Sequence, residues 1–226
     1  MIKNILLIGH KSLLGKSIKV LALKNNDLKV FFLDKYFNED DIYSFAVNHK
    51  LDGTIGKTWK YSSGTSNILS GLIRKQLADD EAYLNFANKE LFNWIGAESM
   101  VLESDPAGTI VGSSYAWATQ RDWAKYGLLY LQNGKVADRQ IFPDWWAEYT
   151  ASPAEGSDDK YGAQFWKQND EEFPNVPKDM YFADGFQGQR IFIIPSKNIV
   201  IVRFGLSNKG DISYDKLLKE IIEAVE

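Results

Sequence analysis

The sequence predicts an α/β protein of the α+β type, with an antiparallel sheet flanked by helices, a helical middle region and an N-terminal βαβ-like segment. Residues 189–194 and 199–204 are apolar runs joined by a short segment that begins with proline, which is typical of a hairpin. In the middle of the chain, apolar residues recur at helical spacing. Residues 3–9 and 28–33 read as buried strands around a helix at 12–24, which indicates a parallel strand pair.

Further helices have recognisable starts and apolar faces. They are expected at residues 40–49, 66–77, 80–95 and 123–131, from Pro143 onward, and at 211–225. Two of them should turn apolar faces inward, made of Ile68, Leu69, Leu72, Ile73 and Leu77 in one and of Leu217, Leu218, Ile221 and Ile222 in the other. Thr119 and Asp122 form a capping box, in which the hydroxyl and the carboxylate each accept a backbone N–H.

Composition excludes several classes of function. The net charge of −4 and the pI of about 5.3 show no basic surplus, so we expect neither nucleic acid nor an anionic membrane as a partner. The absence of cysteine excludes a disulfide scaffold, a thiol nucleophile and thiolate metal sites. Two histidines are too few for a metal centre, and we expect no cofactor. The sequence has no membrane-spanning run and its opening apolar stretch is too short for a signal peptide, which predicts a cytoplasmic chain as written.

Aromatic residues make up 14% of the chain, and six of the seven tryptophans fall between residues 90 and 170. At that density we expect most of them to fill a core between helices. The alternative is a tryptophan-rich cleft whose wall binds an apolar or amide-containing ligand.

Five segments resemble one enzyme family in their order along the chain. They are residues 41–46 leading into 55–59, residues 61–70, the helical block 111–132, residues 183–189 and the hairpin 191–203. In this order they resemble the β-lactamase-related serine hydrolases, which include class C β-lactamases, related esterases and 6-aminohexanoate-dimer hydrolases. The resemblance covers residues 41–205 and implies a β-lactamase/transpeptidase-like fold, incomplete in this chain.

The resemblance implies hydrolysis of an amide or ester bond through an acyl-enzyme, with a small-molecule amide or ester as ligand. By resemblance, Tyr61 is the general base and later the acid towards the leaving group. Ser63 takes the polar position two residues on, where the family often has asparagine, and Ser62 lies between them on the substrate side.

The third motif of the family corresponds to residues 186–189. The backbone N–H of Gln189, just after Gly188, would form half of the oxyanion hole, and the missing side chain of Gly188 would let substrate approach. Phe186 stands where the family has histidine or lysine, so the usual partner of Tyr61 is lost, and Gln187 follows it on the substrate side. We expect this motif on an edge strand.

The Ser-x-x-Lys nucleophile of the family is missing upstream of Tyr61. The sequence has two such patterns, at residues 157–160 and 213–216, and both come after the tyrosine. A Gly-x-Ser-x-Gly elbow is also absent. The sequence therefore predicts a truncated or rearranged member of the family with weak or no activity. Two alternatives stay open: an active hydrolase that recruits Ser62 or Ser63, and a non-catalytic binding module with the tryptophan-rich cleft.

Residues 1–37 are expected to be a βαβ-like segment, which is either a fusion or a remodelled N-terminus of the family, and residues 38–226 a partial hydrolase domain. Residues 9–15 are similar to the Gly-x-x-Gly-x-x-Gly of sugar-nucleotide epimerases, with Ser12 for the middle glycine and Asp34 after the second strand. A dinucleotide site needs further strands that this chain lacks, so we expect no NAD. The sequence does not predict the oligomeric state.

Overall fold

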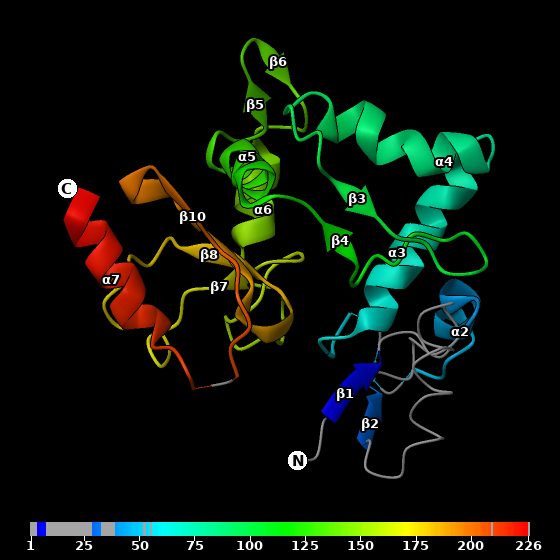
Figure 1. Cartoon of the computed structure of the whole chain (residues 1–226), viewed down its shortest axis with the longest axis horizontal. Helices are drawn as coiled ribbons and strands as arrows, with labels where there is room; N and C mark the ends of the chain where they lie inside the picture. Colours follow the sequence, from blue (N-terminus) through cyan, green and yellow to red (C-terminus); the bar gives the residue numbers. More distant parts are fainter. Residues whose placement is uncertain are drawn as a thin grey trace. The chain divides into compact units, whose positions relative to one another are not determined.

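The computed structural model describes residues 39–51, 53–54, 56–208 and 210–225, together with the backbone of 4–7 and 29–32 (Figure 1). These residues form two units. The first comprises Met1–Leu51, Tyr61–Asn85 and Leu102–Ala116, and the second comprises Asp52–Lys60, Phe86–Val101 and Trp117–Glu226. Each unit therefore combines segments that are distant in sequence.

A four-stranded antiparallel sheet forms the centre of the second unit. Its order is β10-β9-β8-β7, with the strands at Ile199–Arg203, Arg190–Ile194, Tyr181–Asp184 and Trp166–Lys167. The predicted hairpin is confirmed, since β9 and β10 pair antiparallel with Ile194 opposite Ile199. The 3-10 turn η4 (Pro195–Lys197) joins them, and Asn198 closes it with φ 54°, a conformation that asparagine tolerates.

Helices cover both faces of this sheet. Successive side chains of a strand point to opposite faces, and β9 is buried on both. Phe192 and Ile194 lie in one apolar cluster with Leu218 and Ile222 of α7 (Tyr214–Val225). The other face packs on α5 (Gln120–Leu131) and α6 (Trp145–Ala151), in a cluster made of Tyr130, Ala147, Phe165, Tyr181, Ile191 and Ile193. The inward face predicted for the last helix is therefore confirmed.

The start of α5 corrects one detail of the predicted capping box. Thr119 caps the helix by accepting the Asp122 N–H at 3.3 Å, as expected. The Asp122 carboxylate, however, accepts from Lys125 at 2.6 Å and from the Ser99 N–H at 2.9 Å, and the Thr119 N–H goes to the Ser99 hydroxyl instead. The hydrogen bonds from Lys125 and Ser99 lower the pKa of Asp122 to about 2.

Tryptophan fills less of the core than expected. The fully buried large side chains of the described residues are Tyr83, Phe173, Phe192, Leu129, Met180, Ile193, Ile194 and Leu218. Trp94, Trp117 and Trp145 are exposed, and the other four tryptophans are half-buried. Trp123, Trp146 and Trp166 are partly buried and pack against the core clusters, so the expected core role holds for three of the six tryptophans between residues 90 and 170. Smaller rings and aliphatic side chains occupy the centre.

The remaining strand pairs and helices are short. The strand pairs are β3 (Val101–Leu102) with β4 (Ala116–Trp117) and β5 (Lys135–Val136) with β6 (Arg139–Gln140). The helix predicted at 80–95 is present as α4 (Asp80–Ala87) and the π-helical turn η2 (Asn88–Phe92). Helix α6 begins at Trp145 rather than at Pro143, whose carbonyl accepts the Trp146 N–H. Within the described ranges, no helix is long and apolar enough to cross a bilayer.

The first unit contains a parallel strand pair and two packed helices. Strands β1 (Asn4–Leu7) and β2 (Lys29–Phe32) pair in parallel, which confirms the predicted pairing. The helix expected at 12–24, the glycine motif at 9–15 and Asp34 lie outside the described residues, and the boundary near residue 38 stays a prediction. Helix α2 (Ile42–Val47) is capped by Asp41 and packs on α3 (Ser63–Gln76).

Helix α3 buries a face of small and polar residues instead of most of the predicted apolar face. Its buried residues are Gly64, Asn67, Ser70 and Gly71, whereas Leu69, Leu72 and Ile73 are exposed. Close packing explains this choice. A Cβ at Gly71 would lie 2.0 Å from the ring of Tyr43 in α2, so only glycine permits the contact. Of the predicted apolar face, Ile68 is partly buried and packs against the cluster of Ile42, Ala46 and Val111, whereas Leu69, Leu72 and Ile73 do not face this core.

Because α3 buries small polar residues, truncation of Ser70 should destabilise the protein more than truncation of an exposed leucine. The Ser70 hydroxyl lies 2.7 Å from both the Tyr83 hydroxyl and the Ile110 carbonyl oxygen. Ser70→Ala should lower the free energy of unfolding by about 1–2 kcal/mol, because two buried polar groups lose a partner. Leu72→Ala, at a position 45% exposed, should cost less. Urea unfolding of both variants checks this order, and a larger loss for Leu72→Ala would contradict it.

Candidate functional site

The second-motif residues lie at the start of α3. Ser62 is the N-cap, in extended conformation, and its hydroxyl oxygen accepts the Gly64 N–H at 3.2 Å. Tyr61 precedes the cap and is exposed, and Ser63 is the first residue of the helix. The three residues therefore follow one another at a fixed helix end, where the backbone positions each of them.

Asn67 supports this helix start and was not singled out from the sequence. It is 1% exposed, and its side-chain amide donates to the Ser63 carbonyl at 3.0 Å and to the Ser113 hydroxyl at 3.2 Å. Its side-chain carbonyl oxygen is buried without a partner among the described residues. The available signal was an asparagine at the start of a predicted helix, four residues after Ser63. Asn67 ties the second motif to the 112–114 loop.

The third motif is a turn, not part of an edge strand. Phe186–Gly188 forms the 3-10 turn η3 between β8 and β9, which are the two inner strands of the sheet. The expectation of an edge strand is therefore wrong. Gln187 and Gly188 both have positive φ, 54° and 77°. This left-handed pair reverses the chain tightly enough for β8 and β9 to remain neighbours.

Hydrogen bonds hold this turn in one shape. The Gly185 N–H donates to the Gln189 carbonyl at 2.7 Å, and the Ser207 N–H donates to the Gln187 carbonyl at 3.0 Å. The Gln189 side-chain amide reaches the Phe186 carbonyl at 3.3 Å. Phe186 itself is exposed. The turn is thus a stiff element that presents its backbone rather than a charged or imidazole side chain.

Steric crowding also restricts position 188 to glycine. A Cβ there would lie 2.2 Å from the Tyr214 hydroxyl oxygen and 3.1 Å from Nη1 of Arg203. Protein atoms therefore occupy the space beside Gly188. This crowding requires glycine there whether or not a substrate also approaches. The positive φ adds a second restriction.

The two motifs belong to different units. Tyr61, Ser62 and Ser63 lie in the first, and the 186–189 turn lies in the second. The roles expected of these residues stay predictions.

Neither Ser-x-x-Lys pattern has the geometry of a nucleophile with its base. Ser157 is buried and donates to the Tyr161 carbonyl at 3.0 Å, while Lys160 pairs with Glu171 at 3.1 Å. In the second pattern the Ser213 hydroxyl oxygen accepts the Lys216 N–H, and the Lys216 side chain is 75% exposed. A catalytic lysine is desolvated and close to its serine, so both patterns serve the structure.

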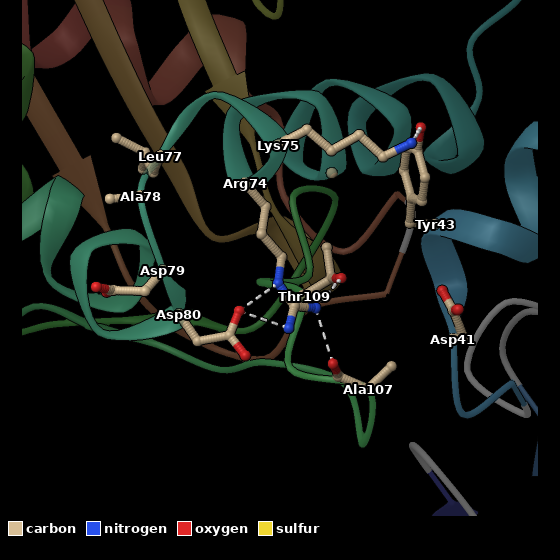
Figure 2. A pocket seen from close by; sticks show the side chains of 11 residues that line it. Asp41, Tyr43, Arg74, Lys75, Leu77, Ala78, Asp79, Asp80, Ala107 and Thr109 are labelled. Atoms are coloured by element: carbon tan, nitrogen blue, oxygen red, sulfur yellow. Dashed lines mark hydrogen bonds and ion pairs between the residues drawn. The ribbon is translucent and has the colours of Figure 1, made fainter.

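A pocket of about 410 Å³ opens in the first unit, beside the C-terminal half of α3 (Figure 2). Figure 2 shows Arg74 pointing to Asp80, with which it pairs at 2.7 Å, and its guanidinium also donates to the carbonyl of Ala107 at 2.8 Å. Lys75 donates to the Tyr43 hydroxyl at 2.8 Å. The two cationic side chains of the pocket, Arg74 and Lys75, are thus already engaged by the protein. Tyr61, Ser62 and Ser63 do not line the pocket.

In the part of the chain that the structure describes, no group of three or more histidine, aspartate or glutamate side chains could hold an ion.

Comparison with known proteins identifies the family of this chain. A sequence model of the β-lactamase family matches residues 21–225. The chain therefore belongs to the β-lactamase family. This confirms the predicted family and the α/β fold class. No curated protein sequence matches the chain significantly.

Solved structures share the fold, among them the following three. A Bacillus anthracis protein described as a 6-aminohexanoate-dimer hydrolase is 24% identical over 91% of this chain, with a TM-score of 0.69. A Bacteroides dorei protein described as a β-lactamase is 13% identical over 83% (TM-score 0.60), and a β-lactamase of Mycobacterium bovis is 17% identical over 76% (TM-score 0.57). The chain spans 53%, 64% and 65% of these structures. At these identities the similarity is one of fold.

Proposed function

We propose that these 226 residues carry the second and third motifs of a β-lactamase-type serine hydrolase and, alone, hydrolyse amides or esters weakly or not at all. The observation behind this is the lack of a serine followed by a lysine one helical turn later anywhere before Tyr61. The two later patterns have their lysines engaged elsewhere or exposed to solvent. Without a nucleophile, only the residual catalysis of binding and of an oxyanion hole is left, orders of magnitude below normal.

The roles proposed for the motif residues follow the family chemistry. Tyr61 would take the proton of an attacking hydroxyl and return it to the leaving group, with Ser62 and Ser63 contacting the substrate amide. The Gln189 N–H would stabilise the oxyanion, and Phe186 and Gln187 would contact the substrate. The ligand class is a small amide or ester. The Bacillus anthracis relative is described as acting on a dimer of 6-aminohexanoate, which makes a linear amide the first substrate to try.

A fluorophosphonate probe tests the proposal directly. After incubation with excess probe, the intact mass of the folded, monodisperse protein should stay unchanged, because no serine is activated. An active serine β-lactamase in a parallel reaction controls for the reagent. A stoichiometric adduct mapped to one serine would refute the proposal and identify the nucleophile.

Ser62 and Ser63 are the serines to watch in that experiment, since both lie beside Tyr61 at the start of α3. If the protein does turn over an ester, Ser62→Ala and Ser63→Ala decide whether either serine is responsible. Turnover abolished by Tyr61→Phe but untouched in both serine variants would exclude the relocated-serine alternative.

Binding without catalysis is favoured by the exposed Trp94, Trp117 and Trp145. A ligand that covers any of these rings should change the tryptophan fluorescence during titration with linear amides and esters. Fluorescence that stays constant across the panel would count against the binding module.

A further inference from the structure

Strand β10, orange in Figure 1, forms one edge of the four-stranded sheet in the second unit. All five of its residues pair one to one with β9, from Ile199 opposite Ile194 to Arg203 opposite Arg190. In an antiparallel ladder only alternate residues bond to the neighbouring strand, so the N–H and C=O groups of the others point outward. No other segment of the described chain pairs with these outward groups. β10 is therefore an open edge strand.

The opposite edge of the same sheet is closed. Strand β7 has only two residues, Trp166 and Lys167. On its outer side Trp166 pairs with Tyr161, and the Lys167 N–H donates to the Lys160 carbonyl at 2.9 Å. A short edge strand that is covered by a loop resists pairing with another chain. The protein thus protects the short edge of the sheet and leaves the longer edge open.

The side chains of β10 are covered only in part. Ile199 and Ile201 belong to the cluster on the α7 side of the sheet, whereas Val200 and Val202 belong to the cluster on the α5 side. All four stay partly exposed, although the residues opposite them in β9, 191–194, are buried. A further strand beside β10 would therefore bury more apolar surface on both faces of the sheet.

The sequence of β10 is complementary to itself. When two copies pair antiparallel with all five residues overlapping, Ile201 lies opposite Ile201 of the other copy and Val200 lies opposite Val202. Ile199 then lies opposite Arg203, whose guanidinium is held by hydrogen bonds within its own copy and whose stem can cover an isoleucine. No like charges meet, and the pairs of β-branched side chains stabilise antiparallel strands.

We propose that β10 is the interface of a symmetric dimer, in which two copies of this chain form one continuous sheet of eight strands, four from each copy. Such an interface is isologous, because each copy contributes the same strand. A second copy suits this edge because full overlap pairs every residue of β10 without a like-charge contact. The inference goes beyond the proposed function and does not depend on hydrolysis.

Light scattering coupled to size-exclusion chromatography tests the dimer. Wild-type protein should have twice the 25.7 kDa mass of the chain. Ile201→Lys and Ile201→Glu should each have the mass of a monomer, because two like charges would face each other between the copies. An equimolar mixture of the two variants should regain the dimer, since a lysine then faces a glutamate. Leu206→Lys, at a position 78% exposed, is the matched control and should remain a dimer.

A variant with a small apolar replacement keeps the test valid even if a charge at position 201 prevents folding. Opposed residues of an antiparallel pair have Cα atoms about 4.5–5.5 Å apart, which is within the range of a disulfide. The chain has no cysteine, so Ile201→Cys should form one disulfide between copies on mild oxidation. Leu206→Cys is the control and should form several-fold less.

Three results would overturn the inference. The first is a wild-type protein with the mass of a monomer. The second is an Ile201→Lys variant that is folded by circular dichroism and stays dimeric, or a mixture of folded Lys and Glu variants that stays monomeric. The third is an Ile201→Cys protein that forms no more disulfide than Leu206→Cys, which would place any contact between copies away from β10.

Discussion

Replacing Phe192 with alanine should lower the free energy of unfolding by about 4 kcal/mol, the range typical of truncating a buried phenylalanine. Phe192 is completely buried in β9. Its ring centre lies 5.5 Å from that of Phe182, 5.9 Å from that of Tyr214 and 6.4 Å from that of Phe173. Removal of the ring leaves a cavity among other rings, which cannot collapse without moving the sheet or α7.

Urea unfolding followed by circular dichroism measures this loss, with Leu206→Ala as the control. Leu206 is 78% exposed, so its truncation should change the free energy of unfolding by less than about 0.5 kcal/mol. A loss below about 1 kcal/mol for Phe192→Ala would contradict the central position of this ring in the second unit.

Gly188→Ala should cost about 3 kcal/mol, in two separable parts. The positive φ of 77° costs an alanine about 1–2 kcal/mol. The new Cβ would also lie 2.2 Å from the Tyr214 hydroxyl oxygen, and relief of such overpacking costs a further 1–3 kcal/mol or so. The matched control is Gly210→Ala, because Gly210 has φ 95° and open space around it. It should show only the conformational part.

A double-mutant cycle identifies the source of the remaining loss. In Gly188→Ala/Tyr214→Phe the clashing hydroxyl is gone, and the nearest ring atom, Cζ, lies 3.5 Å from the Cβ position. The double variant should therefore be more stable than the sum of the two single losses predicts, by about 1 kcal/mol. Strict additivity would show that Tyr214 does not restrict residue 188.

Features that depend on short stretches of sequence could be predicted. The β9–β10 hairpin follows from two apolar runs around Pro195, and the Thr119 cap from its place before Trp123. The inward face of α7, with Leu218 and Ile222, follows from helical spacing. The family followed from the order of several motifs, which chance resemblance seldom reproduces. These signals lie in neighbouring residues, whose steric and hydrogen-bonding preferences act before any tertiary contact forms.

Features that depend on a distant partner could not be predicted. Helix α3 buries Ser70 and Gly71 rather than its leucines, because Tyr43 and Tyr83 reach it from other elements. The carboxylate of Asp122 turns to the N–H of Ser99, 23 residues earlier in the chain, as well as to Lys125 on its own helix.

For the third motif, too, only the local part of the structure could be predicted. Its identity as a glycine-containing turn could be read from residues 185–189, but its place between the inner strands depends on how β8 pairs with β9. Arg203 and Tyr214, which both donate to the Gly188 carbonyl, are 15 and 26 positions away along the chain. Sequence patterns report a residue's intrinsic preference, whereas burial and hydrogen-bond partners depend on which distant groups fill the space around it.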